Sequence, residues 1–522
     1  MDANKICFIT CVNNEEMYRE SVLYINHLVV PKGFNIEFIG IRDANCLTEG
    51  YNQAMSASDA KYKVYLHQDL FIINKNFIHD VLKIFKSDPQ IGMLGVAGAK
   101  KIPPVACWWK ADKKYICVYD NTTGKMNRAN SIAFTEDYTK VAAIDGLLMV
   151  TQYDIKWRDD IFTGWHFYDV SQCVEFSKNS YQIVVPQQAE PWCIHDCGPM
   201  EHDKEYDKYR NIFLDEYSTY LFPLVSILIP TYNRPKYFRI AFESAINQTY
   251  RNLEVIVCDN STNEETAKII EPYLNNPRMR YLRNKDVKTK EANFQKFKDI
   301  TSGEYINWLM DDDVLHVDKI TYMMHIYLEH EEVSLVTSYR QWIDADGNPI
   351  ESLTPFKCEK SEIFDGREIG KKMLFRMSNI VGEPTTVLIK RNLLKHHYWN
   401  ADCRGYKTIS DVAMWLELLS KGKMAYIVES LSSFRRHAEQ EQAGINVVIL
   451  SRIEWYVLAK EAYENGYFIE NTQEYKQCLL QFINDANWLH QFLKNAEDEI
   501  DINLHDQYSK MLLEAKIAVQ KN

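Results

Sequence analysis

One ordered set of three residues occurs twice along the chain: a carboxylate, a second carboxylate and a histidine. The first set is Asp69, Asp169 and His195, and the second set is Asp313, Asp411 and His437. The two carboxylates are 100 positions apart in the first set and 98 in the second, and the histidine follows 26 positions later in both. Chance rarely reproduces such spacing, so the sequence predicts two copies of one domain.

Each half alternates short apolar runs with helical patterns, which is typical of an α/β fold with a parallel, doubly wound sheet. The strands expected in the first half cover residues 5–10, 35–41, 62–66 and 181–185, and a helix covers 15–28. The strands expected in the second half cover residues 224–230, 252–258, 305–310 and 425–428, and a helix covers 408–422. Asp43 precedes Asp69 by 26 positions, whereas Asp259 precedes Asp313 by 54. We therefore expect the first copy to lack about one helix and one strand.

The pattern predicts domains at 1–222 and 223–445, followed by a helical tail at 446–522. Apolar residues in the tail recur on one face at helical spacing. They include Ile453, Val457, Leu458, Ala462, Leu479, Phe482 and Ile483. Such faces usually pack on their own domain, and pairing of two tails in a homodimer is the alternative.

An acidic cluster closes one of the expected strands. The apolar run Tyr305–Met310 ends in Asp311, Asp312 and Asp313. Ligands of α/β sheets bind beyond the carboxyl ends of the strands, where this cluster would lie. Carboxylate oxygens suit Mg²⁺ or Mn²⁺, which keeps open positions for the oxygens of a diphosphate. Alternatively, the three residues only open a helix expected near Val317, since negative charge favours a helix N-terminus.

The composition excludes several classes of protein. The formal net charge of −12 argues against a general nucleic-acid binder. The N-terminus lacks the pattern of a signal peptide, and no apolar run approaches the roughly 20 residues that span a bilayer. Twelve cysteines occur without repeated CxxC pairs, which favours free buried thiols. We therefore expect a cytoplasmic protein with no transmembrane segment and no nucleic-acid partner.

Five segments of the second half resemble one family in the family's own order. They are VSILIPTYNRP, EVIVCDNST, GEYINWLMDDD, SDVAMWLEL and FRRHAEQ, within residues 224–440. The family is the inverting family-2-type glycosyltransferases with the nucleotide-diphospho-sugar (Rossmann-like, A-type) fold. Residues 4–200 resemble a divergent branch through KICFITCVNN, YLHQDLF, GWHFYDV and CIHD. The tandem is similar to bacterial enzymes that build surface polysaccharides or protein-linked glycans.

The resemblance implies roles for residues of the second half. The implied nucleotide-binding residues are Pro230, Thr231, Asn233, Asp259, Asn293 and Asp311. Asp259 would bond the base, most often uracil, and Asp311 would contact the ribose or the metal. Asp313 and His437 would hold Mn²⁺ or Mg²⁺, which offsets the charge on the departing nucleoside diphosphate. Asp411 would accept the proton of the acceptor hydroxyl as its oxygen attacks and inverts the anomeric carbon.

Each of these roles has a structural alternative. Asp411 could be only a helix N-cap, and Asp259 could be only a turn residue. His437 could belong to a surface cluster with its two preceding arginines. Glu383, in GEPTT, could lie on the acceptor side or be structural.

In the first half the implied roles are carried over by position. Asp69 and His195 would hold the metal, Asp169 would be the base, and Thr10 and Asp43 would bind the nucleotide. Trp165 and His166 would lie at the acceptor. His67-Gln68-Asp69 keeps one carboxylate where the second half has three, so metal affinity would be weaker or the ligation different. Zinc held by Cys193, His195, Cys197 and His202 is the alternative, although CxHxC is not a common structural zinc spacing.

Three functions follow from these features. The first is a bifunctional, metal-dependent transferase that uses nucleotide sugars, UDP-sugars first, on a glycan, glycolipid or glycoprotein acceptor. A lipid-linked acceptor would be met at the cytoplasmic face of the membrane. The second makes only the second half catalytic and the first half a nucleotide-sugar or acceptor-binding module. The third, a nucleotidylyltransferase, is disfavoured because neither half has a Gly-rich loop bearing Lys or Arg after its first strand.

Overall fold

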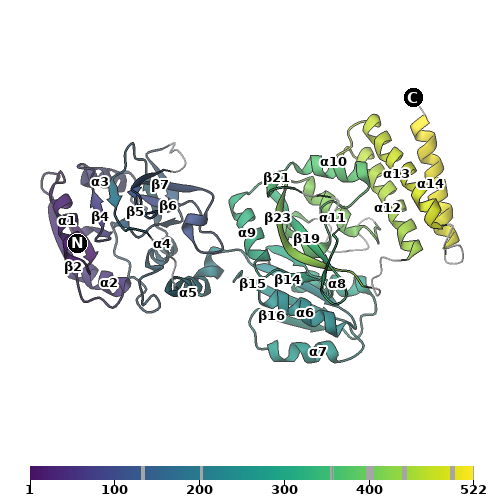
Figure 1. The fold of residues 1–522 in the computed structure, drawn as a ribbon, viewed down its shortest axis with the longest axis horizontal. Coiled ribbons are helices and arrows are strands. Elements are labelled where there is room, and N and C mark those ends of the chain that lie inside the picture. Colours follow the sequence, from purple (N-terminus) through teal and green to yellow (C-terminus); the bar gives the residue numbers. More distant parts are fainter. Residues whose placement is uncertain are drawn as a thin grey trace. The chain divides into compact units, whose positions relative to one another are not determined.

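The computed structural model describes residues 1–130, 136–199, 204–352, 356, 358–394, 405–437, 444–493 and 500–520. The chain forms two compact units, Met1–Leu221 and Phe222–Asn522 (Figure 1). Each unit has its own sheets and its own buried apolar clusters. Both units are mixed α/β structures, as predicted, and helices end the chain.

The main sheet of the first unit has seven strands in the order β2-β1-β3-β11-β5-β12-β9. They are β1 (Asp2–Cys11), β2 (Asn35–Ile41), β3 (Ala60–Leu66), β5 (Ile91–Gly95), β9 (Tyr138–Val141), β11 (Leu148–Thr151) and β12 (Gln182–Pro186). β1 pairs in parallel with β2 and β3, but β11 is antiparallel to β3 and β5. The expectation of a wholly parallel sheet is therefore wrong. Parallel neighbours need a crossover, usually a helix, and the described residues between β5 and β11 contain no α-helix.

A second sheet of the first unit brings distant residues together. Its order is β10-β6-β7-β13-β4, with β8 beside β7. The strands are β4 (Leu70–Ile72), β6 (Ala97–Ala99), β7 (Lys114–Asp120), β8 (Asn127–Asn130), β10 (Ala143–Ile144) and β13 (Cys193–His195). The helices are α1 (Glu15–Asn26), α2 (Leu47–Ala57), α3 (Phe77–Ser87), η1 (Trp108–Lys110), α4 (Tyr168–Lys178) and α5 (Lys204–Leu221). In this sheet His195 pairs with Leu70 on β4 and with Asp120 on β7.

The sheet of the second unit runs β16-β15-β14-β17-β22-β19-β23-β18. The strands are β14 (Val225–Thr231), β15 (Leu253–Asp259), β16 (Met279–Arg283), β17 (Tyr305–Trp308), β18 (Val314–Leu315), β19 (Val333–Ile343), β20 (Pro349–Ile350), β21 (Glu362–Phe364), β22 (Leu388–Lys390) and β23 (Lys423–Arg435). The helices before the tail are α6 (Pro235–Ile246), α7 (Glu265–Ile270), η2 (Glu271–Tyr273), α8 (Lys290–Ile300), α9 (Lys319–Glu329), α10 (Gly366–Arg376), η3 (Pro384–Thr386), η4 (Arg391–Leu393) and α11 (Ser410–Leu419). β14 to β17 are parallel, so their carboxyl ends share one edge.

The comparison of the two units confirms the predicted deletion. Only α2 lies between β2 and β3, whereas α7, β16 and α8 lie between β15 and β17. β23 is much longer than the expected strand at 425–428, because its polar second half continues to pair with β19. Ser430 and Ser432 interrupt the apolar pattern, so apolar runs alone do not predict that half of β23 as a strand.

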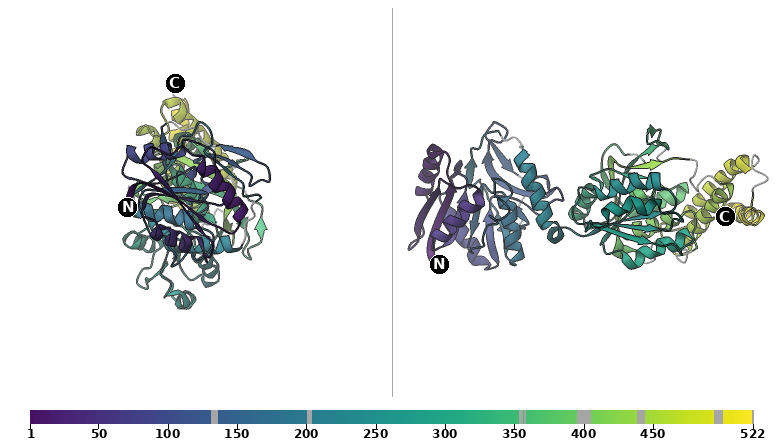
Figure 2. Two further views of the ribbon diagram at one scale, coloured as in Figure 1. Left: turned by 90° about the vertical axis from the view of Figure 1, so that its left-hand side faces the viewer. Right: turned by 90° about the horizontal axis from the view of Figure 1, so that it is seen from below.

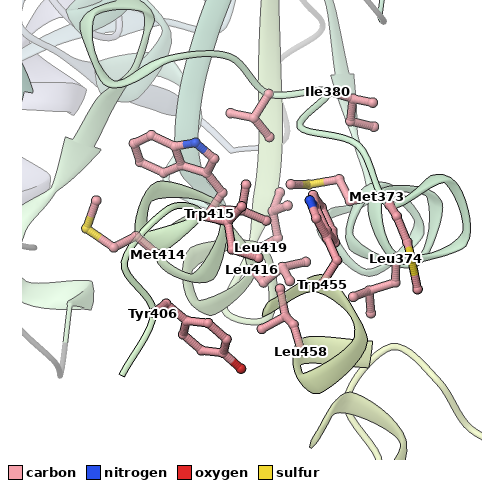
Figure 3. Close-up of a cluster of buried hydrophobic side chains, with 14 of the residues drawn as sticks. Met373, Leu374, Ile380, Tyr406, Met414, Trp415, Leu416, Leu419, Trp455 and Leu458 are labelled. Carbon is pink, nitrogen blue, oxygen red and sulfur yellow. The ribbon is translucent and has the colours of Figure 1, made fainter. Parts of the chain in front are cut away.

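The tail belongs to the core of the second unit. Its helices α12 (Ile445–Glu464), α13 (Thr472–Leu493) and α14 (Ile502–Gln520) pack against one another (Figures 1 and 2). Just before α13, Asn471 accepts a hydrogen bond from the Glu474 N–H at 3.0 Å, as a residue at a helix N-terminus does. Trp455 and Leu458 of α12 share one buried cluster with Trp415 of α11 (Figure 3). None of the described helices combines the length and apolarity of a bilayer-spanning segment.

Candidate active sites

The acidic cluster of the second unit lies at the carboxyl end of β17. Asp311, Asp312 and Asp313 are all buried. Arg234, which precedes α6, lies 3.4 Å from Asp311 Oδ1 and 3.3 Å from Asp312 Oδ2. His437 Nε2 lies 3.0 Å from Asp312 Oδ2. The structure thus brings His437 to the cluster, but its partner is Asp312, a residue without a predicted role of its own. The last residues of FRRHAEQ, 438–440, lie outside the described residues.

Asp313 is held by two donors from distant parts of the unit. Its Oδ2 accepts a hydrogen bond from the Thr385 hydroxyl at 2.6 Å, and its Oδ1 accepts one from the Arg435 N–H at 3.0 Å. Burial and the neighbouring Asp312 charge raise the pKa of Asp311 to about 6 and raise the pKa of Asp313 well above its usual range. A divalent cation would remove this repulsion, so the residues present fit a hard cation.

The predicted nucleotide residues gather at the ends of β14 and β15, where Thr231 pairs with Asp259. Pro230, Thr231 and Asp259 are buried, and Asp259 accepts hydrogen bonds from Tyr281 at 2.8 Å and Arg283 at 2.5 Å. Asp259 is the last residue of β15, and its Oδ1 accepts a hydrogen bond from the Ser261 N–H at 2.8 Å, so it also makes the turn contact of the alternative prediction.

Two predicted nucleotide residues also support the backbone at this edge. Asn233 has a left-handed φ of 53° and accepts a hydrogen bond from the Thr262 N–H at 2.9 Å. The Asn293 amide donates to Cys258 O at 2.9 Å and accepts from Asn284 at 2.8 Å. Asn293 therefore fixes the strand end that carries Asp259.

Asp411 lies in the first turn of α11 and is partly buried. The helix N-cap is Ile409, so the alternative that Asp411 is only a cap is wrong. Its Oδ2 accepts a hydrogen bond from Asn379 at 3.0 Å. Burial, with a contribution from the Glu383 charge, raises the pKa of Asp411 to about 7. A carboxylate with this pKa can accept a proton near neutral pH.

The Glu383 charge acts on both the acidic cluster and Asp411. Its carboxylate forms an ion pair with the buried Arg340, with Arg340 Nη2 3.0 Å from Glu383 Oε1. The Glu383 charge raises the pKa of both Asp313 and Asp411, so all three lie within one electrostatic environment. The ion pair favours the structural alternative for Glu383.

A tail residue holds the segment that leads into α11. Glu454 of α12 is buried and accepts hydrogen bonds from the backbone N–H groups of Lys407 at 2.6 Å, Thr408 at 2.9 Å and Ile409 at 3.1 Å. It also accepts a hydrogen bond from the Thr408 hydroxyl at 2.5 Å. The tail therefore helps to position Asp411. No sequence pattern distinguishes Glu454 from the other glutamates of α12, so this role could not be predicted.

Replacing Glu454 by Ala should destabilise the second unit by about 2–4 kcal/mol, because several buried donors lose their acceptor. Urea unfolding of the full chain measures this loss. Glu464→Ala removes an exposed carboxylate of the same helix, 3.8 Å from Lys460, and should stay within about 0.5 kcal/mol of wild type. Equal effects of the two variants would contradict the structural role of Glu454.

The first unit assembles a different cluster at the corresponding strand end. β3 ends at Leu66, and His67, Gln68 and Asp69 lead into β4. Asp69 Oδ1 lies 3.7 Å from His195 Nε2 and 3.9 Å from His67 Nδ1. The structure therefore brings Asp69 and His195 together and adds His67. That histidine was visible in the sequence, since it precedes Asp69 by two positions as Asp311 precedes Asp313.

Asp169 opens α4 beside this cluster. Its carboxylate accepts hydrogen bonds from the Gly146 N–H at 3.0 Å and the Val170 N–H at 2.8 Å. Burial and the Asp145 charge raise the pKa of Asp169 to about 7, as burial does for Asp411. The neighbouring Tyr168 hydroxyl lies 2.6 Å from His67 Nε2, so the start of α4 contacts the histidine cluster.

The remaining predicted residues of the first unit are more dispersed. Thr10 is buried in β1, whereas Asp43 and Trp165 are exposed. Cys193 packs in an apolar cluster, and the candidate metal-ligand groups of the described residues include His195 and Cys197 but not Cys193. His202, the fourth member of the alternative zinc set, lies outside the described residues.

Both units match known family models. Residues 7–217 match a glycosyltransferase like family, and residues 226–396 match glycosyl transferase family 2. Chondroitin synthase of Escherichia coli is 36% identical over 129 residues, which are 24% of this chain and 19% of that protein. An uncharacterized glycosyltransferase of Rickettsia prowazekii is 29% identical over 220 residues, 42% of this chain and 65% of that protein. The chain thus spans less than two thirds of the length of these relatives.

Solved structures give weaker likenesses. S. aureus TarS 1–349 in complex with UDP-GlcNAc has a TM-score of 0.40 at 16% identity, covering 57% of this chain and 81% of that one. The mannosyltransferase PcManGT from Pyrobaculum calidifontis, in complex with GDP-Man and Mn²⁺, has a TM-score of 0.35 at 12% identity, covering 58% and 88%.

Proposed function

We propose that this chain, a tandem of two glycosyltransferase domains, is a bifunctional enzyme with one transfer site in each unit. Each site would take a sugar from a nucleotide-diphosphate donor and pass it with inversion to a hydroxyl group of a growing glycan. One repeated arrangement supports this proposal. In each unit a carboxylate with a pKa of about 7 lies in the first turn of a helix, and the same unit holds a cluster of side chains suited to a cation.

In the second unit the proposed chemistry divides between two groups of residues. Asp311 and Asp313 would hold Mn²⁺ or Mg²⁺ with His437 beside them, and the bound cation would offset the charge on the departing nucleoside diphosphate. Asp411 would take the proton of the acceptor hydroxyl as its oxygen attacks the anomeric carbon. Asn379 orients the Asp411 carboxylate through the hydrogen bond at 3.0 Å. No covalent sugar–enzyme intermediate is needed.

UDP-sugars are the donors we propose first, with a polysaccharide or another glycan as acceptor. The similarity to chondroitin synthase supports a glycan-building role. The test is nucleoside-diphosphate release by the full chain with UDP-, GDP- and dTDP-sugars, Mn²⁺ or Mg²⁺, and simple sugars or glycans as acceptors. The anomeric configuration of the product, read by NMR, would be opposite to that of the donor. Retention of configuration, or no turnover with any donor, would contradict the proposal.

A second candidate keeps only the second unit catalytic. The observation in its favour is that the first unit offers Asp69 where the second unit offers three carboxylates. The first unit would then bind a nucleotide sugar or the acceptor. Donor turnover unaffected by Asp169→Asn, together with donor binding by that variant, would support this function.

The pH dependence of the second site follows from Asp411. Because the folded pKa is about 7, the ionised base is about one tenth of the population at pH 6 and about nine tenths at pH 8. Transfer at saturating donor should therefore rise about tenfold between these values. Initial rates across about pH 5–9 measure the rise. A rate that already levels off near pH 5 would contradict it.

The same group has the opposite effect on folding. The unfolded chain loses this proton near pH 4, whereas the folded chain keeps it until about pH 7. The contribution of Asp411 to stability therefore falls as the pH rises from 4 to 7, and Asp411→Asn should remove that dependence.

We propose a cytoplasmic protein that meets a lipid-linked acceptor at the membrane face. The tail exposes Leu480, Leu513 and Ile517, through which two copies could pair as a homodimer. Sedimentation of wild type and of Leu513→Glu would show whether such a pair forms.

A further inference from the structure

We propose that the first unit holds a divalent transition-metal ion on His67 Nδ1, Asp69 Oδ1 and His195 Nε2, and that this site prefers Zn²⁺ or Co²⁺ to Mg²⁺. The inference deepens the proposed function and rests on it for the role of the ion in catalysis, but not for its binding. It would make the two units of one chain different in metal preference.

The three candidate ligand residues lie close together. Asp69 Oδ1 lies 3.9 Å from His67 Nδ1 and 3.7 Å from His195 Nε2, and all three atoms lie within 4.8 Å of one another. Ligands about 2.0–2.1 Å from a tetrahedral zinc ion are about 3.3 Å apart. The two separations from Asp69 Oδ1 exceed this value by about 0.4–0.6 Å, so an ion would draw each histidine nitrogen toward Asp69 by about that amount.

Two of these atoms are buried without a hydrogen-bond partner among the described residues. They are Asp69 Oδ1 and His195 Nε2, and the His195 residue is only 5% exposed. A buried polar atom without a partner is costly, and a bound cation would satisfy both atoms at once. A proton on His195 Nε2 is the alternative, and the binding test below separates the two.

The outer nitrogen of each imidazole is held by another side chain. His67 Nε2 lies 2.6 Å from the Tyr168 hydroxyl, and His195 Nδ1 donates to Asp120 Oδ2 at 3.3 Å. Asp120 is itself fixed by hydrogen bonds from the Thr122 N–H at 2.9 Å and hydroxyl at 2.5 Å. A metal ion would replace the proton on His195 Nε2, which lies 3.7 Å from Asp69 Oδ1, while Nδ1 keeps donating to Asp120. Metal-binding histidines show this arrangement, in which an outer partner fixes the ring and its tautomer.

The types of ligand atom set the metal preference. Two imidazole nitrogens and one carboxylate suit Zn²⁺, Co²⁺ and related ions, whereas Mg²⁺ prefers oxygen ligands only. The second unit offers carboxylates at the corresponding place, with His437 directed to Asp312. One chain would therefore combine a nitrogen-rich site with an oxygen-rich site.

Cation binding to the metal-free full chain tests the inference. Asp313→Asn serves as the background, so that the second unit does not obscure the result. Zn²⁺, Co²⁺ and Mg²⁺ are titrated singly, without nucleotide sugar, by calorimetry and by the visible absorption of bound Co²⁺. We expect one tight site for Zn²⁺ and Co²⁺, with Mg²⁺ at least about 100-fold weaker.

Three variants locate that site. His67→Gln and His195→Gln should each weaken Zn²⁺ binding at least about 100-fold, and Asp120→Asn should weaken it about 10–100-fold. His27→Gln changes an exposed histidine at the end of α1 and should bind as the background does. Circular dichroism and thermal melting identify any variant that fails to fold, and His67→Asn then replaces His67→Gln.

Three results would overturn the inference: no binding at one equivalent, Zn²⁺ affinity unchanged by His67→Gln, or Mg²⁺ bound as tightly as Zn²⁺. If no cation binds at one equivalent, the cluster is instead an ion pair of protonated His195 with Asp69 and Asp120. Because no donor is present, this test is separate from transferase activity. Tight Zn²⁺ binding together with turnover unaffected by Asp169→Asn would retain the metal site and reject catalysis in the first unit.

Discussion

Asp411→Asn should lower transfer by the second unit about 10²–10⁴-fold, because the variant keeps the shape of the side chain but cannot accept a proton. The KM for the donor should change little, since Asp411 lies on the acceptor side of the proposed reaction. The measurement is the initial rate of nucleoside-diphosphate release at saturating donor and acceptor.

The folded state should tolerate this substitution. The pKa of about 7 shows that burial disfavours the charged form, so a neutral amide costs little at neutral pH. Asp346→Asn, at an exposed position of the same unit, is the matched control and should keep the wild-type rate. If both variants keep the wild-type rate, Asp411 is not the base.

Removal of divalent cations with a chelator should lower the second unit's transfer by a similar factor of about 10²–10⁴. A cation at a departing diphosphate supplies several kcal/mol, and each 1.4 kcal/mol is about tenfold in rate. Added Mn²⁺ or Mg²⁺ should restore the wild-type rate. Asp313→Asn should show the same loss without restoration, because the carboxylate that would ligate the ion is gone.

The matched control for Asp313→Asn is Asp318→Asn, which changes an aspartate just before α9, outside the acidic cluster. It should respond to chelation and to added metal as wild type does. Full activity of wild type after chelation, confirmed by metal analysis, would contradict a metal-dependent second site.

Much of the fold was predictable because it depends on local apolar patterns. The segments 35–41 and 224–230 are mostly apolar, and the strands of the structure begin and end within one residue of the predicted limits. The orientation of β11 was not predictable, since it depends on which strands lie beside it. The polar half of β23 was missed because its pairing with β19 replaces the apolar signal.

Part of each candidate site could likewise be predicted from the sequence, and part could not. The repeated spacing was enough to group Asp69 with His195, and in the fold β13 pairs with β4 and places His195 opposite Leu70, next to Asp69. The partners that tune each carboxylate come from segments distant in sequence, such as Asn379 for Asp411 and Thr385 for Asp313. No local pattern marks such pairs, so only the folded chain reveals them.

The most direct test of the central claim compares the wild-type chain with Asp169→Asn and Asp411→Asn on every donor that it turns over. Two transfer sites predict that each variant abolishes nucleoside-diphosphate release from a different donor and leaves the other unchanged. If Asp411→Asn alone has an effect, the first unit is a binding module, which contradicts the bifunctional account. If neither variant has an effect, the two carboxylates are not the catalytic bases.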